Sequence, residues 1–200
     1  MPRIEEDIFQ VHHRQSFWSE VTRQMLDLEN RSERLFWNSF DSTYVDAQLI
    51  GRRRLVDSDV RAITLRRLLG QLEQLRSQIT FEWWVEHHAA DESDIAHFRE
   101  RFTNEYVDKP SDLRLGRVVI SSLRDRLDDR FRRIVAFVNA HLAHRDLSAP
   151  PTTVTYSDLD EGVLELGDLF RWCACLLSAS DYPTLTPEPL GDIVRPLRPS

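Results

Sequence analysis

The feature that most constrains the fold is one long apolar stripe in the second half of the chain. Apolar residues recur there at steps of three or four positions, which is the period of one face of an α-helix. The stripe consists of Ile120, Leu123, Leu127, Phe131, Ile134, Val138 and Leu142. Similar spacing recurs over residues 4–28, 65–79 and 159–177, and no segment alternates as a half-buried strand does. The pattern predicts an all-α fold.

Turn-forming residues divide the chain into helices and a tail. The sequence holds only 6 Gly and 9 Pro, and five of the prolines follow residue 182. Ser58-Asp59 and Ser157 are typical of helix starts, since their side chains can accept hydrogen bonds from the first turn. We expect a single bundle of about six helices over residues 1–182. An extended Pro-rich tail follows over residues 183–200.

Charged residues are unevenly distributed along the chain. The net charge of −7 argues against general nucleic-acid binding. However, 25 of the 26 basic residues are Arg, with Lys109 the sole lysine, and Arg outnumbers the acids over residues 52–67 and 114–145. These two segments are either solvated helix faces or surfaces that meet a phosphate backbone, for which Arg is the preferred bidentate donor.

Several classes of function find no support in the sequence. It contains no Gly-rich phosphate loop, no nucleophile elbow and no pair of CxxC motifs. Cys173 falls in the apolar stripe of the last helix and is expected in the core. No run reaches the roughly 18 apolar residues of a membrane span, and residues 1–7 are acidic, unlike a signal peptide. We expect no cofactor, no bound metal, no membrane contact and a cytoplasmic location.

The most specific signal lies where the long stripe ends. Residues 137–146 read Phe-Val-Asn-Ala-His-Leu-Ala-His-Arg-Asp, and residues 155–159, after a proline loop, read Thr-Tyr-Ser-Asp-Leu. This arrangement resembles the HEPN superfamily, and within it the branch of proteins similar to abortive infection protein U. Residues 54–69 resemble a second segment shared by that branch. The place of the motif's Arg is held by Val138. The motif positions that match are Asn139, Ala143, His144 and Asp146.

The resemblance implies a helical, two-fold dimeric protein of bacterial phage-defence or toxin–antitoxin type that cleaves RNA without a metal ion. Its implied partners are RNA and an antitoxin or another protein. The implied catalytic residues are Asn139, His144 and Asp146. Arg145, which is next to His144, is the candidate to replace the motif's arginine, and further RNA contacts are assigned to Arg130, Arg133 and His141. His144 would act as general acid or base, because the pKa of histidine lies near neutrality. Arg145, or an Arg of the partner subunit, would stabilise the phosphorane.

Three functions remain open at this point. The chain is a metal-independent ribonuclease, a non-catalytic relative that binds RNA, nucleotide or protein, or a helical interaction module with solvated Arg-rich faces. Val138 stands in the apolar stripe and is therefore expected to be buried, which favours the second and third functions. The two Arg-rich segments favour the first and second. The 5 Trp and 10 Phe are many for one bundle and favour a homodimer.

Overall fold

The structure is a computed structural model that describes residues 2–25, 34–59, 61–88, 95–143 and 153–178, together with Leu185. Within these ranges the chain forms seven α-helices and one π-helical turn. In chain order they are α1 (Pro2–Met25), α2 (Arg34–Leu55), α3 (Leu65–Leu75), α4 (Phe81–His88), α5 (Ile95–Glu105), α6 (Arg117–Phe137), η3 (Val138–Ala143) and α7 (Tyr156–Ser178).

The predicted all-α fold is confirmed. In the described part of the chain, β-pairing is limited to one isolated bridge between Thr80 and Arg114. There is one helix more than the expected six or so, because the aromatic segment around Trp83 forms the separate short helix α4. No helix among the described residues has the length and apolar character that a membrane crossing requires.

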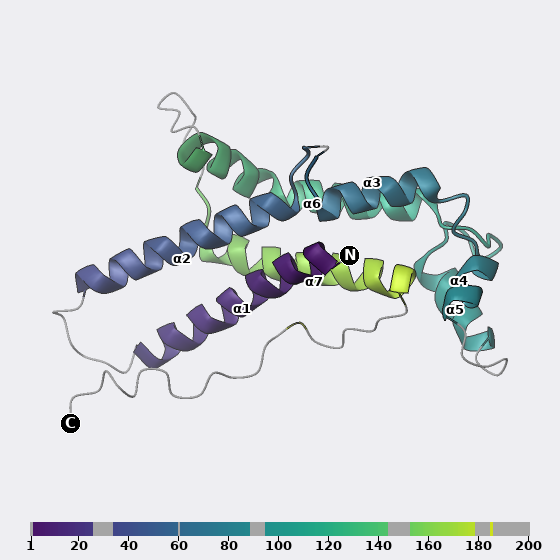
Figure 1. The fold of residues 1–200 in the computed structure, drawn as a ribbon, viewed down its shortest axis with the longest axis horizontal. Coiled ribbons are helices and arrows are strands. Elements are labelled where there is room, and N and C mark those ends of the chain that lie inside the picture. Colours follow the sequence, from purple (N-terminus) through teal and green to yellow (C-terminus); the bar gives the residue numbers. More distant parts are fainter. Residues whose placement is uncertain are drawn as a thin grey trace.

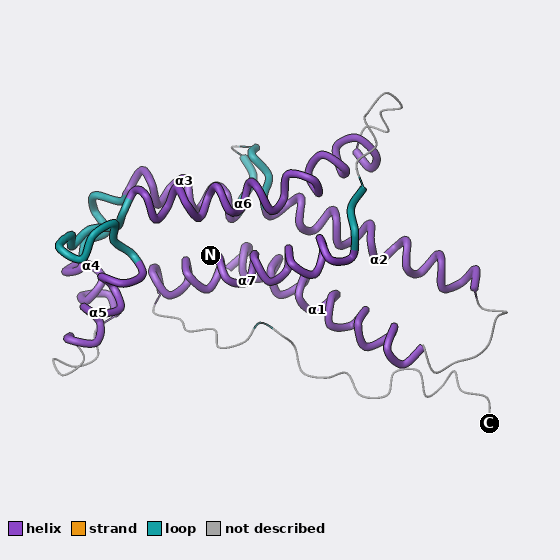
Figure 2. Tube along the Cα trace, turned by 180° about the vertical axis from the view of Figure 1, so that it is seen from behind, coloured by secondary structure: helices purple, strands orange, loops and turns teal. Residues whose placement is uncertain are grey.

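The helices form two packed layers closed at one end by a short pair (Figures 1 and 2). α1 and α2 lie side by side as an antiparallel pair, and α3 continues beyond α2 along α6. α7 runs back beneath α6 and packs against both α6 and α1. α4 and α5 pack together at the end of the molecule where α3 ends and α6 begins. The end of α6 and the start of α7 therefore lie at the opposite end, near α2.

One hydrophobic core connects all seven helices. Each helix buries apolar side chains in it, including Ile8 from α1, Leu49 from α2, Trp84 from α4 and Phe131 from α6. α7 contributes most, since buried residues occur along its whole length, and Cys173 lies among them as predicted. The Pro-rich tail lies outside the described residues except for Leu185, which is buried and part of the same core.

Two helix starts differ from those expected. α3 begins at Leu65, and its cap is Thr64, whose hydroxyl accepts a hydrogen bond from the Arg67 backbone N–H at 3.0 Å. Ser58-Asp59 lies in the preceding loop, where the Asp59 carboxylate accepts from the Arg61 N–H instead. Before α7, Thr155 takes the place predicted for Ser157. Its N–H donates to Asp158, and its Oγ1 accepts from the Asp158 N–H, which is the reciprocal pairing of a capping box.

The start of α6 depends on a close contact between Asp108 and Gly116. The Asp108 carboxylate accepts hydrogen bonds from the backbone N–H groups of Arg117 (2.9 Å) and Val119 (3.1 Å), which have no partner within the helix. A Cβ on Gly116 would lie 2.6 Å from the Asp108 backbone nitrogen and would also collide with its carboxylate. Only glycine fits at this position.

We therefore expect Gly116→Ala to lower the free energy of unfolding by about 1–3 kcal/mol, the usual cost of overpacking. Urea denaturation would measure the change. Gly70→Ala is a matched control, because a Cβ on Gly70 would meet nothing within 4 Å. That change should raise stability by up to about 1 kcal/mol through helix propensity. Equal stability of Gly116→Ala and the native protein would show that Asp108 has room to move.

Candidate functional site

Residues 138–143 of the motif form a π-helical turn at the end of α6. The α-helix ends at Phe137, and residues Val138–Ala143 continue it as η3 with a wider spacing between hydrogen-bonded residues. Such turns are often found at functional sites, because they change the direction in which side chains leave the helix. The expectation of one regular α-helix to about residue 146 was wrong at this point. Val138 itself is 5% exposed, so its predicted burial is confirmed.

The side chain of Asn139 meets an arginine from α2. Asn139 is exposed, and its Oδ1 accepts a hydrogen bond of 3.2 Å from Nε of Arg53. Nη1 of Arg53 forms an ion pair of 2.7 Å with Asp57. Within the described residues Nη2, the third nitrogen of the Arg53 guanidinium, makes no hydrogen bond. We call the group of Arg53, Asp57 and Asn139 the α2–η3 corner.

Asp57 holds the arginine of this corner in a charged pair. Partial burial opposes ionisation of the carboxyl, but the Asp59 backbone N–H and the Arg53 guanidinium both stabilise the carboxylate. The net result is that the pKa of Asp57 lies below its usual value. Asp57 therefore stays ionised at neutral pH and fixes the direction of the Arg53 side chain.

The structure places the other predicted site residues in different surroundings. His141 is half-buried, and its ring lies 4.7 Å from the ring of Phe137, so it packs on the helix. His144, Arg145 and Asp146 lie outside the described residues. Among the predicted catalytic residues, Asn139 is the one whose surroundings the structure describes.

Arg130 and Arg133 belong to a row of ion pairs between α6 and α7, which we call the α6–α7 ladder. Arg133 pairs with Asp158 at 3.1 Å and also donates to the Thr153 carbonyl at 2.7 Å, and Arg130 pairs with Glu161. One turn earlier, Arg126 pairs with Glu165 at 2.9 Å. The three arginines line a groove of about 710 Å³ together with Asp158 and Glu165. Its arginines already have carboxylate partners, so a phosphate would have to compete with the acidic face of α7.

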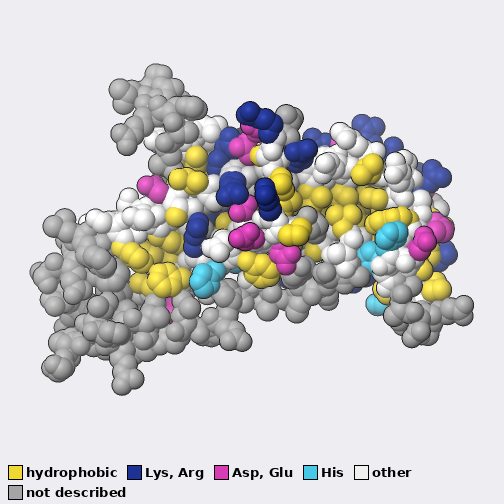
Figure 3. Space-filling view, viewed as in Figure 1, with side chains coloured by type: hydrophobic (Ala, Val, Ile, Leu, Met, Phe, Trp, Pro, Cys, Tyr) yellow, Lys and Arg dark blue, Asp and Glu magenta, His cyan; other side chains and the backbone are white. Residues whose placement is uncertain are grey.

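Basic and acidic side chains also alternate around the end of α2 and the first half of α1, as Figure 3 shows. One of these pairs joins Arg54 of α2 to Asp7 of α1 at 3.4 Å. The first Arg-rich segment is therefore split. Arg54 is paired across the helix hairpin, and Arg53 points to the α2–η3 corner.

Arg52, the preceding residue, is fully buried behind this corner. Its guanidinium donates to the carbonyls of Gln48 (3.1 Å) and Leu159 (2.8 Å), to the Gln48 side-chain oxygen and to Oε1 of Gln15 (3.0 Å). Gln15 in turn donates to the Asp160 carboxylate. Burial lowers the pKa of Arg52 to about 10, while Tyr44 and Asp160 act in the opposite direction. Arg52 is thus a buried cation that joins α1, α2 and α7 through neutral acceptors.

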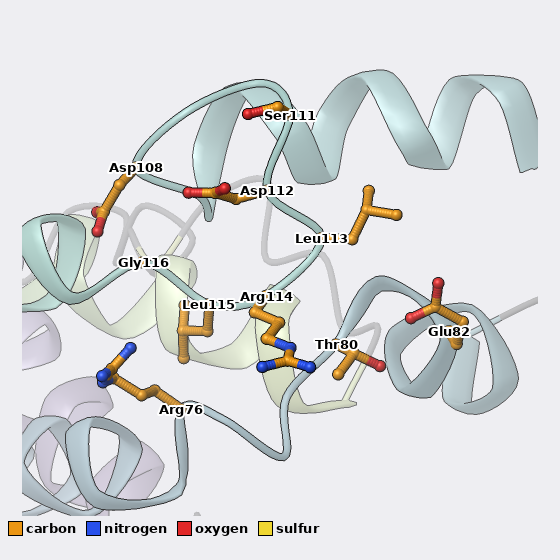
Figure 4. A pocket seen from close by; sticks show the side chains of 10 residues that line it. All are labelled: Arg76, Thr80, Glu82, Asp108, Ser111, Asp112, Leu113, Arg114, Leu115 and Gly116. Carbon is orange, nitrogen blue, oxygen red and sulfur yellow. The ribbon is translucent and has the colours of Figure 1, made fainter.

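A separate pocket of about 510 Å³ lies at the opposite end of the molecule (Figure 4). Arg76 at the end of α3 and Arg114 before α6 extend toward it, and Asp108, Asp112 and Glu82 line it as well. Asp108 already occupies the N-terminus of α6. The pocket combines both charge signs around a helix start that is already capped, and we assign it no ligand.

Neither Arg53 nor Arg52 was individually predictable as a site residue from the motif. The predicted arginines, Arg130, Arg133 and Arg145, are close to Val138 in the sequence. Arg53 comes from α2, 86 positions away from Asn139. One available signal was the spacing of Tyr44, Gln48 and Arg52, three polar residues on one face of α2.

Comparison with known proteins adds no relative to this description. No family model, no curated protein and no solved structure matches the chain. Within the described ranges, no three His, Cys, Asp or Glu side chains are grouped so that they could hold a metal ion. The α2–η3 corner is therefore the candidate functional site.

Proposed function

We propose that this protein is a HEPN-like ribonuclease that binds the RNA backbone at the α2–η3 corner and cleaves it without a metal ion. The observation that carries the proposal is the hydrogen bond between Arg53 and Asn139. It brings a cation to the motif segment, in which Val138 occupies the place of the arginine. Arg53 would bind the phosphate, and His144, five residues after Asn139, would transfer protons as general acid or base.

The geometry of Arg53 suits a phosphate ligand. Two of its nitrogens are held by Asp57 and Asn139, so the guanidinium is oriented before any ligand arrives. The remaining nitrogen, Nη2, can donate to a phosphate oxygen. Charge-assisted hydrogen bonds of this kind are stronger than hydrogen bonds between neutral groups. Preorganised donors stabilise developing charge well, because they need little reorganisation during the reaction.

A second candidate function is RNA binding without cleavage, and the burial of Val138 favours it. The motif's arginine would belong to the same helix as Asn139, whereas Arg53 belongs to α2. In the second function Arg53 still binds the phosphate, but His144 transfers no proton and the RNA is not cleaved. The implied homodimer and the antitoxin partner stay predictions under either function.

The test is cleavage of single-stranded RNA by the purified protein in the presence of EDTA. We expect cleavage by the native protein, a loss of roughly hundredfold or more in His144→Ala, and a loss of about tenfold or more in Arg53→Gln. The second value corresponds to one lost hydrogen bond to a charged group. Arg54→Gln is the matched control, because Arg54 is the next residue but pairs with Asp7.

The outcomes separate the open functions. Binding that depends on Arg53 with no cleavage by any variant supports the non-catalytic function. If Arg53→Gln and Arg54→Gln both behave like the native protein, the corner is not the RNA site. If the protein neither binds nor cleaves RNA, the third function, a helical interaction module, is supported.

A further inference from the structure

A polar groove leads away from the α2–η3 corner along α3. It has a volume of about 500 Å³ and lies between the loop after α2, one face of α3 and the side of α6. Asp57, which pairs with Arg53 in the corner, also lines this groove, so the two features share a residue. The lining residues are Asp57, Ser58, Asp59, Arg66, Arg67, Gly70, Gln71, Gln74 and Arg124.

Gly70 lies in the middle of α3, where glycine is unfavourable for a helix. A Cβ at this position would meet nothing within 4 Å, so no neighbouring group in the described structure requires a glycine. This contrasts with Gly116, whose Cβ would collide with Asp108. A glycine in a helix that packing does not require is explained if a ligand approaches the backbone closely.

The residues around Gly70 suit a nucleic-acid strand. Arg67, Gln71 and Gln74 are exposed and follow the spacing of one helix face, which passes through Gly70. The Arg67 side chain donates at 3.4 Å to the Ala62 carbonyl and has no carboxylate partner among the described residues, so its charge is available to a phosphate. The amides of Gln71 and Gln74 can donate to and accept from bases or ribose hydroxyls.

The other two arginines of the groove differ from Arg67 in their partners. Arg66 pairs with Asp128, and Arg124 pairs with Glu73. Both pairs join α3 to α6 and form the wall of the groove. Because Arg66 and Arg124 have carboxylate partners and Arg67 has none among the described residues, Arg67 is the arginine of the groove that suits a phosphate.

We propose that this groove is an extended RNA subsite, which holds the nucleotides next to the phosphate bound at the α2–η3 corner. Arg67 contacts a backbone phosphate, Gln71 and Gln74 contact sugars or bases, and the strand passes directly over Gly70. The proposal rests on the proposed function, because it takes the corner as the point where the strand enters. It predicts that affinity depends on RNA length through residues of α3.

The experiment measures binding of two fluorescent single-stranded RNAs, a trinucleotide and a dodecanucleotide, by anisotropy. Both carry 2′-O-methyl groups, so that the RNA stays intact, and the bases that Gln71 and Gln74 can contact are unchanged. We expect Gly70→Leu to weaken dodecanucleotide binding about tenfold or more by filling the groove, and to leave trinucleotide binding unchanged. Its melting temperature should equal or exceed that of the native protein, because leucine favours a helix more than glycine. Loss of binding without loss of stability excludes misfolding as the cause.

Two further variants sharpen the result. Ala96→Leu places the same side chain at an exposed position of α5 and should bind both RNAs like the native protein. Arg67→Gln should weaken dodecanucleotide binding. It should also make the fall of log affinity with log salt less steep by about one unit of slope, the effect expected for one lost phosphate contact.

The failures of the two proposals can be told apart. If Arg53→Gln weakens binding of both RNAs while Gly70→Leu and Arg67→Gln have no effect, the groove is not a subsite and the corner proposal stands. If Gly70→Leu weakens dodecanucleotide binding while Arg53→Gln changes neither RNA, the groove binds RNA and the corner assignment is wrong. Absence of binding to either RNA overturns both.

Discussion

Arg52→Ala is expected to lower the free energy of unfolding by about 3–5 kcal/mol, because it leaves a cavity and removes a donor from several buried acceptors. Arg52 is 0% exposed and is hydrogen-bonded to groups of all three helices α1, α2 and α7. The substitution removes a donor from the Leu159 carbonyl and from the side-chain oxygens of Gln15 and Gln48, and the space of the lost side chain becomes a cavity. Urea denaturation followed by circular dichroism would measure the loss.

The control and a second variant test the stated cause. Arg54→Ala removes a cation whose side chain is 68% exposed and should cost at most about 1 kcal/mol, as exposed ion pairs do. Arg52→Met fills most of the space without a buried charge and should cost less than Arg52→Ala. If Arg52→Ala were as stable as Arg54→Ala, the network would contribute nothing to the contact between α1, α2 and α7.

Val138→Arg is the second large expected effect, a loss of stability of about 3 kcal/mol or more. The side chain of Val138 is buried in the apolar stripe of α6, and an arginine there would carry an unpaired charge into the core. Thermal or urea unfolding would show the loss. Ala136→Arg is the matched control two positions earlier, because Ala136 is exposed and its replacement should change stability by no more than about 0.5 kcal/mol.

The same variant also tests the assignment of the motif. If Val138→Arg folds as well as the native protein and increases RNA cleavage, position 138 faces the corner and the arginine completes the motif. The expected result is the reverse, a destabilised protein with no gain of activity. That result would leave Arg53 as the arginine that contacts Asn139 within the described residues.

The helices were predictable because their signals are local. The apolar spacing around Ile120 and Phe131 depends only on the period of the helix, and the structure buries those residues. Helix starts were less predictable, since Ser58, Thr64, Thr155 and Ser157 are all acceptable caps by residue type. The choice depends on which backbone N–H groups each hydroxyl can reach, and this is known only once the turn is formed.

Only the part of the candidate site that depends on local sequence was predictable, because contacts between helices are decided by tertiary packing. Asn139 stood out in a motif, but Arg53 reached it by the packing of α2 against η3, a contact between residues 86 positions apart. Arg130 and Arg133 were predicted to contact RNA, and in the structure both form ion pairs with α7. Their pairing with Asp158 and Glu161 required knowledge that α7 lies alongside α6.

The sequence by itself determined that this protein is helical, that Val138 and Cys173 belong to the core, and that a polar motif lies at the end of the long stripe. These properties follow from periodicity and residue type, which act over a few turns of one helix. Only the tertiary structure decided which of three consecutive arginines is buried, which meets Asn139 and which pairs with Asp7. Successive residues of a helix point about 100° apart, so their surroundings are set by the helices that pack around them.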